Sequence, residues 1–169
     1  MKFFISFLVV LYCFCQSSLA QPLYQQRQSL EGLGTISVGA YINKNKNVDL
    51  RGVVTEKSLR TEIELALRKS NLSIKDTLFD VLLDLDISLM RPTYISGQKV
   101  KSYYYTISLQ LKEFVWNVRL PAVSAIVWTE RRMGICDAGR LADEVDDVVN
   151  ELTNSFINDY LAANPKDDG

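Results

Sequence analysis

The chain of 169 residues has the length of one domain, carries 19 Lys and Arg against 20 Asp and Glu, and contains no histidine. A formal net charge of −1 gives no basic face of the kind that nucleic acid binding needs. The lack of histidine excludes Ser-His and Cys-His nucleophile pairs, imidazole acid–base catalysis and histidine metal ligands.

The first twenty residues have the layout of a secretory signal peptide. Lys2 gives a positive start, residues 3–15 form an almost unbroken apolar run, and Ser18 and Ala20 are the small residues that precede a cleavage site. An apolar run of about 13 residues is shorter than the roughly 20 that a membrane span requires. We therefore expect cleavage near Ala20 and an exported protein, periplasmic or secreted, with no transmembrane segment in its mature form. A retained N-terminal anchor is the alternative.

The three cysteines bear on both processing and chemistry. Cys13 and Cys15 raise the alternative of a lipid-modified cysteine, but the bulky residues before them do not fit a lipoprotein processing site. Cleavage near Ala20 leaves Cys136 as the single cysteine, which excludes an internal disulfide. Cys136 is then either a buried small apolar residue or a reactive or intermolecularly paired thiol.

Hydrophobic periodicity divides the rest of the chain into strands and helices. Period-two alternation predicts strands, and apolar residues spaced by three and four predict helices. The expected strands cover residues 35–42, 81–89, 103–112 and 123–129, and the expected helices cover residues 55–71 and 139–163. The remaining segments are a flexible leader over 21–32, a loop with two glycines over 131–139 and a polar tail over 167–169.

The order of these elements is strand, helix, three strands, helix. The clean alternation over residues 103–112 indicates one buried and one solvated face, which is typical of an antiparallel sheet. We therefore expect a single α+β domain over residues 33–166. Its four-stranded, mainly antiparallel sheet would carry both helices on one face.

Large aromatic residues predict a binding surface on the uncovered face of this sheet. If the alternation of the 103–112 strand persists past Lys112, Phe114 and Trp116 fall on its polar side with Tyr104. Trp128 lies on the adjacent expected strand and would join them. Two arginines nearby would contact an anion. The candidate binding residues are Tyr104, Phe114, Trp116, Trp128, Arg131 and Arg132. The alternative is that both tryptophans complete the core, because a single β-bulge reverses the faces of a strand.

Two groups of residues keep an enzyme open as an alternative. Asp80, Asp84 and Asp86 could bind a hard cation or share a proton, but no further ligand completes a site. Cys136 precedes a predicted helix, whose dipole could lower the pKa of the thiol, but no partner base is visible. We therefore expect no metal site and no cofactor.

Four segments carry a resemblance to a known group of proteins. They are LRTEIELALRKSNLSI over residues 59–74, YYYTISLQL over 103–111, Val127-Trp128-Thr129, and FINDYLAANPK over 156–166. In this order they resemble a family of small exported bacterial proteins known only as hypothetical. That family has no catalytic residues to carry over, and residues 130–136 replace its Gly/Ser-rich stretch. The element order is also similar to that of envelope accessory domains such as the lipopolysaccharide-assembly lipoproteins.

These observations favour a non-catalytic envelope or periplasmic protein that binds a protein partner or an amphipathic ligand through the aromatic sheet face and binds no nucleic acid. The alternatives are an enzyme of unknown reaction that uses Cys136 or the aspartates, and a secreted protein that acts outside the cell.

Overall fold

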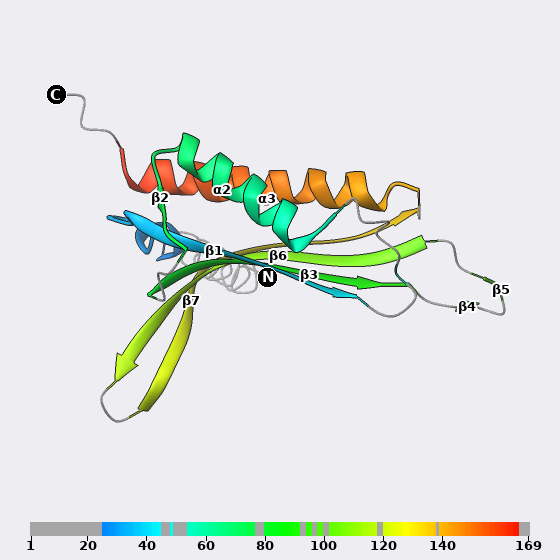
Figure 1. Ribbon diagram of the computed structural model, residues 1–169, viewed down its shortest axis with the longest axis horizontal. Helices are drawn as coiled ribbons and strands as arrows, with labels where there is room; N and C mark the ends of the chain where they lie inside the picture. Colours follow the sequence, from blue (N-terminus) through cyan, green and yellow to red (C-terminus); the bar gives the residue numbers. More distant parts are fainter. Residues whose placement is uncertain are drawn as a thin grey trace, which may run out of the picture.

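Two helices lie side by side on one face of a five-stranded sheet, so the expected α+β class is confirmed (Figure 1). The computed structural model describes residues 25–44, 48, 54–76, 80–91, 94–95, 98–99, 102–117, 120–137 and 139–165, and of residues 94–95, 98–99, 115–117 and 120–122 the backbone alone. The expected signal peptide over residues 1–20 and the polar tail over 167–169 lie outside this part of the chain.

The elements agree closely with the expected ones where those were long. The long helices are α2 (Glu56–Lys69) and α3 (Leu141–Ala163), and residues 25–28 form a further short helical turn. The strands of the sheet are, in spatial order, β2 (Ser73–Ile74), β1 (Thr35–Lys44), β3 (Val81–Met90), β6 (Ser102–Asn117) and β7 (Leu120–Asp137). Two further strands of two residues, β4 (Tyr94–Ile95) and β5 (Gln98–Lys99), pair with each other.

The sheet is mixed, which corrects the expectation of a four-stranded, mainly antiparallel sheet. β3, β6 and β7 are antiparallel neighbours, whereas β1 runs parallel to both β3 and β2. The connection between β1 and β3 contains α2. Because such a crossover helix returns the chain to the end of the sheet at which β1 began, β3 runs parallel to β1. β2 was not predicted because two residues carry no periodicity.

α2 begins and ends where the sequence indicates. The hydroxyl of Thr55 accepts a hydrogen bond from the Ser58 backbone N–H, and the Ser58 hydroxyl accepts one from the Thr55 N–H, both at 3.0 Å. This reciprocal cap satisfies donors that the first turn leaves free. Asn71 has a φ of 66°, a left-handed conformation that stops the helix.

β7 continues through the residues that were expected to form a loop over 131–139. It pairs with β6 from Thr129 to Asp137 without interruption, so that expectation is wrong. The charged residues of this edge strand explain the error. Arg132 forms ion pairs with Glu130 and with Glu151 of α3, where a strand residue would normally contact an apolar core. A charged, glycine-containing segment therefore forms a strand here.

A β-bulge interrupts the pairing of β6 with β7. Leu111 pairs with Trp128 and Lys112 pairs with Ile126, so Val127 is an extra residue in β7. A bulge bends a strand and changes which side chains share a face. Beyond it, the ends of β6 and β7 turn away from the two helices (Figure 1).

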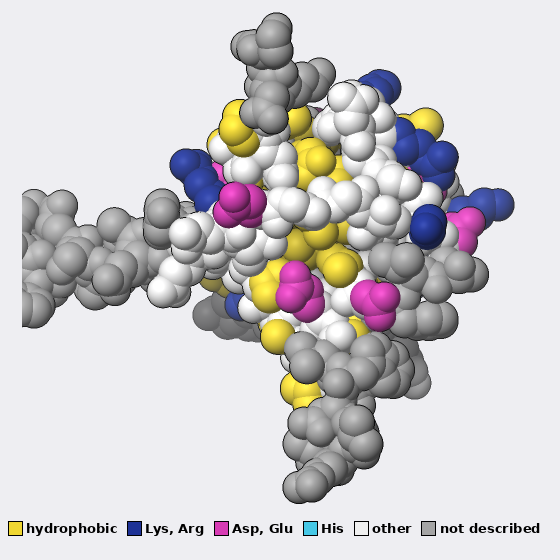
Figure 2. Space-filling view, turned by 90° about the vertical axis from the view of Figure 1, so that its left-hand side faces the viewer, with side chains coloured by type: hydrophobic (Ala, Val, Ile, Leu, Met, Phe, Trp, Pro, Cys, Tyr) yellow, Lys and Arg dark blue, Asp and Glu magenta, His cyan; other side chains and the backbone are white. Residues whose placement is uncertain are grey.

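The expected flexible leader over 21–32 packs on the domain over its described residues 25–32. Leu30 is completely buried, and the Asn164 amide donates to its carbonyl oxygen at 2.7 Å while accepting from the Gly32 N–H at 2.8 Å. The hydroxyl of Ser29 donates to the carbonyl of Val127 at 3.0 Å. At this end of the molecule, apolar side chains gather among charged ones (Figure 2). The domain therefore begins before residue 33.

The core lies between the helices and the sheet. α2 contributes Leu59, Ile63 and Leu67, and α3 contributes Leu141, Val145, Val148, Val149, Leu152 and Phe156. From the sheet come alternate residues of each long strand, among them Ile36, Val38, Leu83, Leu85, Ile87, Ile107, Leu109 and Leu111. The alternation that predicted the strands is confirmed by these buried faces.

Candidate functional site

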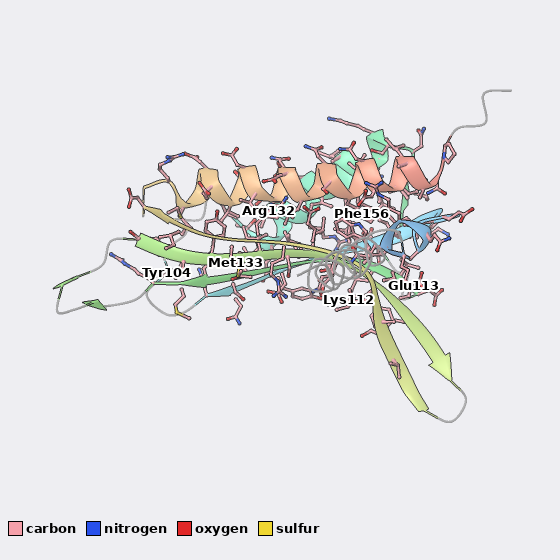
Figure 3. The ribbon with its side chains drawn as sticks, turned by 180° about the vertical axis from the view of Figure 1, so that it is seen from behind. Tyr104, Lys112, Glu113, Arg132, Met133 and Phe156 are labelled. Atoms are coloured by element: carbon pink, nitrogen blue, oxygen red, sulfur yellow. The ribbon has the colours of Figure 1, made fainter. Side chains whose placement is uncertain are left out.

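The face of the sheet turned away from the helices, which we call the open face, holds the candidate surface. Tyr104 and Met133 lie on this side of the sheet, whereas Arg132 and Phe156 lie between the sheet and the helices (Figure 3). In each strand the side chains that alternate with core residues point to the open face. Functional side chains must be sought there, because α2 and α3 cover the other face.

Three large apolar side chains form a line across the open face. Met90 of β3 is in register with Tyr104 of β6, and Tyr104 is in register with Ile135 of β7. Their exposed fractions are 61%, 37% and 61%. We call these three residues the apolar row. Side chains in register on neighbouring strands lie about 4.5–5.5 Å apart, so the row is one continuous surface.

The set of open-face residues next to the apolar row, in register across the same three strands, is uncharged. There, Ser88 pairs with Thr106, and Thr106 pairs with Met133, which is 74% exposed. A shallow hollow of about 330 Å³ adjoins Met90 and Tyr104. The sequence analysis missed Met133 and Ile135 because it assigned them to a loop, although their apolar character every second residue is a strand signal.

Phe114 does not join Tyr104 in one cluster. Phe114 is half-buried, its N–H donates to the Asp80 carbonyl at 2.9 Å, and it lines a different hollow of about 450 Å³ with Tyr41. At about 3.3 Å per residue, ten residues of strand place Phe114 about 33 Å from Tyr104. The backbone of Trp116 belongs to β6, and its side chain lies outside the described part of the structure.

Trp128 belongs to the core, not to the open face, which corrects its expected exposure. Its side chain is 1% exposed, and its ring meets Phe156 edge-on, with centroids 5.1 Å apart and an interplanar angle of 77°. The extra residue Val127 shifts the register, so that Trp128 pairs with the core residue Leu111. This is the β-bulge alternative left open for the tryptophans.

Arg131 and Arg132 cannot contact one anion together, because consecutive strand residues point to opposite faces. Arg131 is exposed and in register with Ser108 on the open face. Arg132 lies on the helix side, 2.7 Å from a carboxylate oxygen of Glu130 and 2.8 Å from one of Glu151. These carboxylates raise the pKa of its guanidinium.

The acidic group of β3 is tied to a lysine. Asp84 is buried and forms an ion pair with Lys112 of β6. Lys112 lies on the open face of the sheet (Figure 3). Asp86 is exposed, and the carbonyl of Asp80 accepts from Phe114. In the described residues no group of three or more acidic or cysteine side chains is placed to hold a metal ion.

Cys136 is buried beside the start of α3. Desolvation raises the pKa of its thiol, and the carboxylates of Glu144 and Asp137 raise it further, while Arg140 opposes them. The helix dipole therefore does not produce the low pKa that a nucleophilic thiol needs. Cys136 packs as a small apolar residue against the core.

No family model and no curated protein sequence matches the chain. Among solved structures it is similar to rare lipoprotein B from Shewanella oneidensis, at 19% identity and a TM-score of 0.32 over 77% of this chain and 92% of that one. It is also similar to a hypothetical protein from Chlamydia trachomatis, at 8% identity and 0.40 over 76% and 98%, and to a minor lipoprotein from Acinetobacter baumannii, at 10% and 0.35 over 78% and 93%.

None of the helices that the structure describes combines the length and the apolar character of a membrane span.

Proposed function

We propose that the chain is an exported, non-catalytic protein of the cell envelope that binds a protein partner through the apolar row on its open face. The apolar row is the observation that carries this proposal. Met90, Tyr104 and Ile135 are large, adjacent and exposed on three hydrogen-bonded strands, so they form a patch rather than scattered apolar residues.

The composition of the row favours a protein surface as its occupant. Tyrosine and methionine are enriched in the centres of protein interfaces, where the flexible methionine fits irregular partners. Ser88 and Thr106 beside the row are small and uncharged, so a partner could cover them without stranding a charge. A typical interface covers about 800 Å² on each partner, so a partner centred on the row would extend over the neighbouring residues of the sheet.

Export is proposed from residues 1–20, whose charged start, apolar run and small residues near Ala20 form a signal peptide pattern. The envelope is proposed from the same segment together with the resemblance of residues 59–166 to small exported bacterial proteins. A protein that acts outside the cell is the alternative that fractionation of the culture tests.

The enzyme alternative receives no support from the residues that suggested it. Cys136 is buried with a raised thiol pKa, and Asp84 is paired with Lys112. Both arrangements oppose reactivity, because a buried protonated thiol is a poor nucleophile and the charge of the Asp84 carboxylate is compensated by the Lys112 ammonium.

Site-specific photocrosslinking in the native cell tests the proposal. A photoreactive phenylalanine derivative replaces Met133 beside the row, and the matched control carries it at Leu65, an exposed apolar residue of α2. We expect one crosslinked protein from position 133 and none from position 65. Ile135→Asp is then added to the protein that carries the photoreactive residue at position 133. This substitution should abolish the crosslink and leave the unfolding midpoint nearly unchanged, since Ile135 is exposed.

Other outcomes contradict the proposal. A crosslinked protein that forms equally from both positions, or that survives Ile135→Asp, shows that the row is not the binding surface. An adduct with the mass of a lipid or another small amphiphile shows an amphipathic ligand in place of a protein.

A further inference from the structure

The far ends of β6 and β7 form a projection that the apolar row does not explain. We call residues 114–117 of β6 and 120–126 of β7 the arm. The strands still pair along it, Phe114 with Ser124, Val115 with Val123 and Asn117 with Leu120. The arm bends away from the helices, beyond the bulge at Val127, and stands clear of the rest of the sheet (Figure 1).

The arm is unusually apolar for a projecting hairpin. Between Phe114 and Ile126 the only charged residue in the sequence is Arg119, in a chain of which 23% is charged. Charged residues return at the base of the arm, where Glu113 pairs with Ala125 and Lys112 pairs with Ile126. Isolated two-stranded hairpins are at best marginally stable in water, and exposed strands of soluble proteins normally carry charges. The composition therefore indicates that another phase or molecule covers the arm.

Both faces of the arm carry exposed apolar side chains over residues 123–126, where the structure describes the side chains of its second strand. Val123 and Ile126 are each 54% exposed, and because they are three residues apart on one strand they point to opposite faces. Ser124 and Ala125 between them are exposed as well. A protein groove covers one face of a hairpin, whereas a lipid phase surrounds both, so this arrangement favours a lipid surface.

The depth of insertion follows from length and hydrogen bonding. The longer strand of the arm, residues 120–126, reaches about 23 Å at about 3.3 Å per residue, which is less than the roughly 30 Å of a hydrocarbon core. The outer edges of a two-stranded hairpin also keep unpaired N–H and C=O groups, which are costly in hydrocarbon. The arm therefore fits the boundary between headgroups and acyl chains, about 5–10 Å deep, where water still reaches its edges.

The sequence of the arm matches this boundary. Trp116 lies on it, and tryptophan is enriched where headgroups meet acyl chains. Arg119, which follows β6 in the sequence, is the sole charged residue between Glu113 and Glu130, and its cation suits anionic headgroups. From these observations we infer that the arm inserts into the interfacial layer of an anionic phospholipid bilayer, anchoring the domain to a membrane surface. This goes beyond the proposed partner site on the apolar row.

The two tryptophans make the inference testable without a label. The exported form of the protein is mixed with vesicles of three parts phosphatidylethanolamine to one part phosphatidylglycerol, with some acyl chains brominated near the headgroup. Trp128 is buried against Phe156 and should not respond. We expect flotation with the vesicles and a bromine-quenched, blue-shifted emission that is absent from the Trp116→Phe variant.

Matched substitutions separate the arm from the body. Val123→Asp should lower the vesicle partition coefficient by about tenfold or more, because a charge replaces an inserted side chain. Leu65→Asp, at a residue of α2 that is 56% exposed, should leave it unchanged. Either no vesicle binding, or binding without quenching of Trp116, would overturn the inference. So would a loss with Leu65→Asp equal to that with Val123→Asp. Conversion of a dimer to a monomer by Val123→Asp would do so as well, because it would show that a second copy covers the arm.

Discussion

Trp128 and Asp159 connect the last strand to the last helix through a hydrogen bond of 3.1 Å from the indole N–H to a carboxylate oxygen. The other oxygen of Asp159 accepts from Arg27 at 2.8 Å, so one carboxylate joins β7, α3 and the N-terminal segment. Asp159 and the core residue Phe156 both belong to the C-terminal stretch on which the family resemblance rests. Within this chain, that stretch closes one end of the domain.

Trp128→Ala should lower the free energy of unfolding by about 3–5 kcal/mol, because it removes a buried aromatic side chain and leaves a cavity beside Phe156. Urea unfolding followed by circular dichroism measures the change. Met133→Ala on the same strand is the control and should alter stability by no more than about 0.5 kcal/mol, since Met133 is exposed. Equal effects of the two substitutions would place Trp128 outside the core.

The register of β7 shows why the elements could be predicted while the site could not. Alternation over residues 103–111 gives the correct buried face, because each of Tyr103, Tyr105 and Ile107 packs under the helices. The faces beyond Lys112 depend on the bulge at Val127, and no local pattern in the sequence marks that extra residue. Trp128 was therefore placed correctly on a strand but not on its face.

The exposed residues were missed for a related reason. Met133 and Ile135 alternate with Arg132, Gly134 and Cys136, and arginines with a glycine are typical of a loop. The strand forms because β6 supplies partners for the whole segment and because Glu151 of α3 neutralises Arg132, and both are tertiary contacts. Local propensity is overridden where such contacts are available.

Gly134→Ala should lower the free energy of unfolding by about 1–3 kcal/mol, because a side chain there would overlap with the ring of Tyr105. Tyr105 is buried and its hydroxyl donates to Glu144 at 2.7 Å, so the ring has little freedom to move aside. Gly139→Ala is the matched control, since nothing lies within 4 Å of the added carbon. A smaller cost of Gly134→Ala in a Tyr105→Phe background, measured by a double-mutant cycle, would identify the overlap with the hydroxyl, and an equal cost for both glycines would refute it.

Cys136 should react with a thiol reagent at least about tenfold more slowly in the native protein than in urea, since burial limits access and the raised pKa lowers the thiolate fraction. The rate of Ellman's reaction near neutral pH measures this. Glu144→Gln should raise the native rate, because it removes the carboxylate that most disfavours the thiolate. A native rate equal to the unfolded one would revive the interpretation of Cys136 as a reactive thiol.

Alkaline titration should show one tyrosine that ionises late. Burial, together with the hydrogen bond to the carboxylate of Glu144, raises the pKa of Tyr105 to about 12, from the ordinary value of about 10. The folded state thus holds this proton more tightly than the unfolded state. Its contribution to stability is complete below about pH 10 and is lost as the pH rises towards about 12.

The ultraviolet absorbance of tyrosinate, followed across this range, measures the ionisation directly. Of the eight tyrosines, the one that titrates near pH 12 should disappear in Tyr105→Phe. The free energy of unfolding of the same variant should fall less steeply between about pH 10 and 12, because phenylalanine at position 105 cannot ionise in the folded or the unfolded state. A wild-type protein whose stability falls with the same slope as Tyr105→Phe would mean that the Tyr105 phenol is not held in its neutral form by the fold.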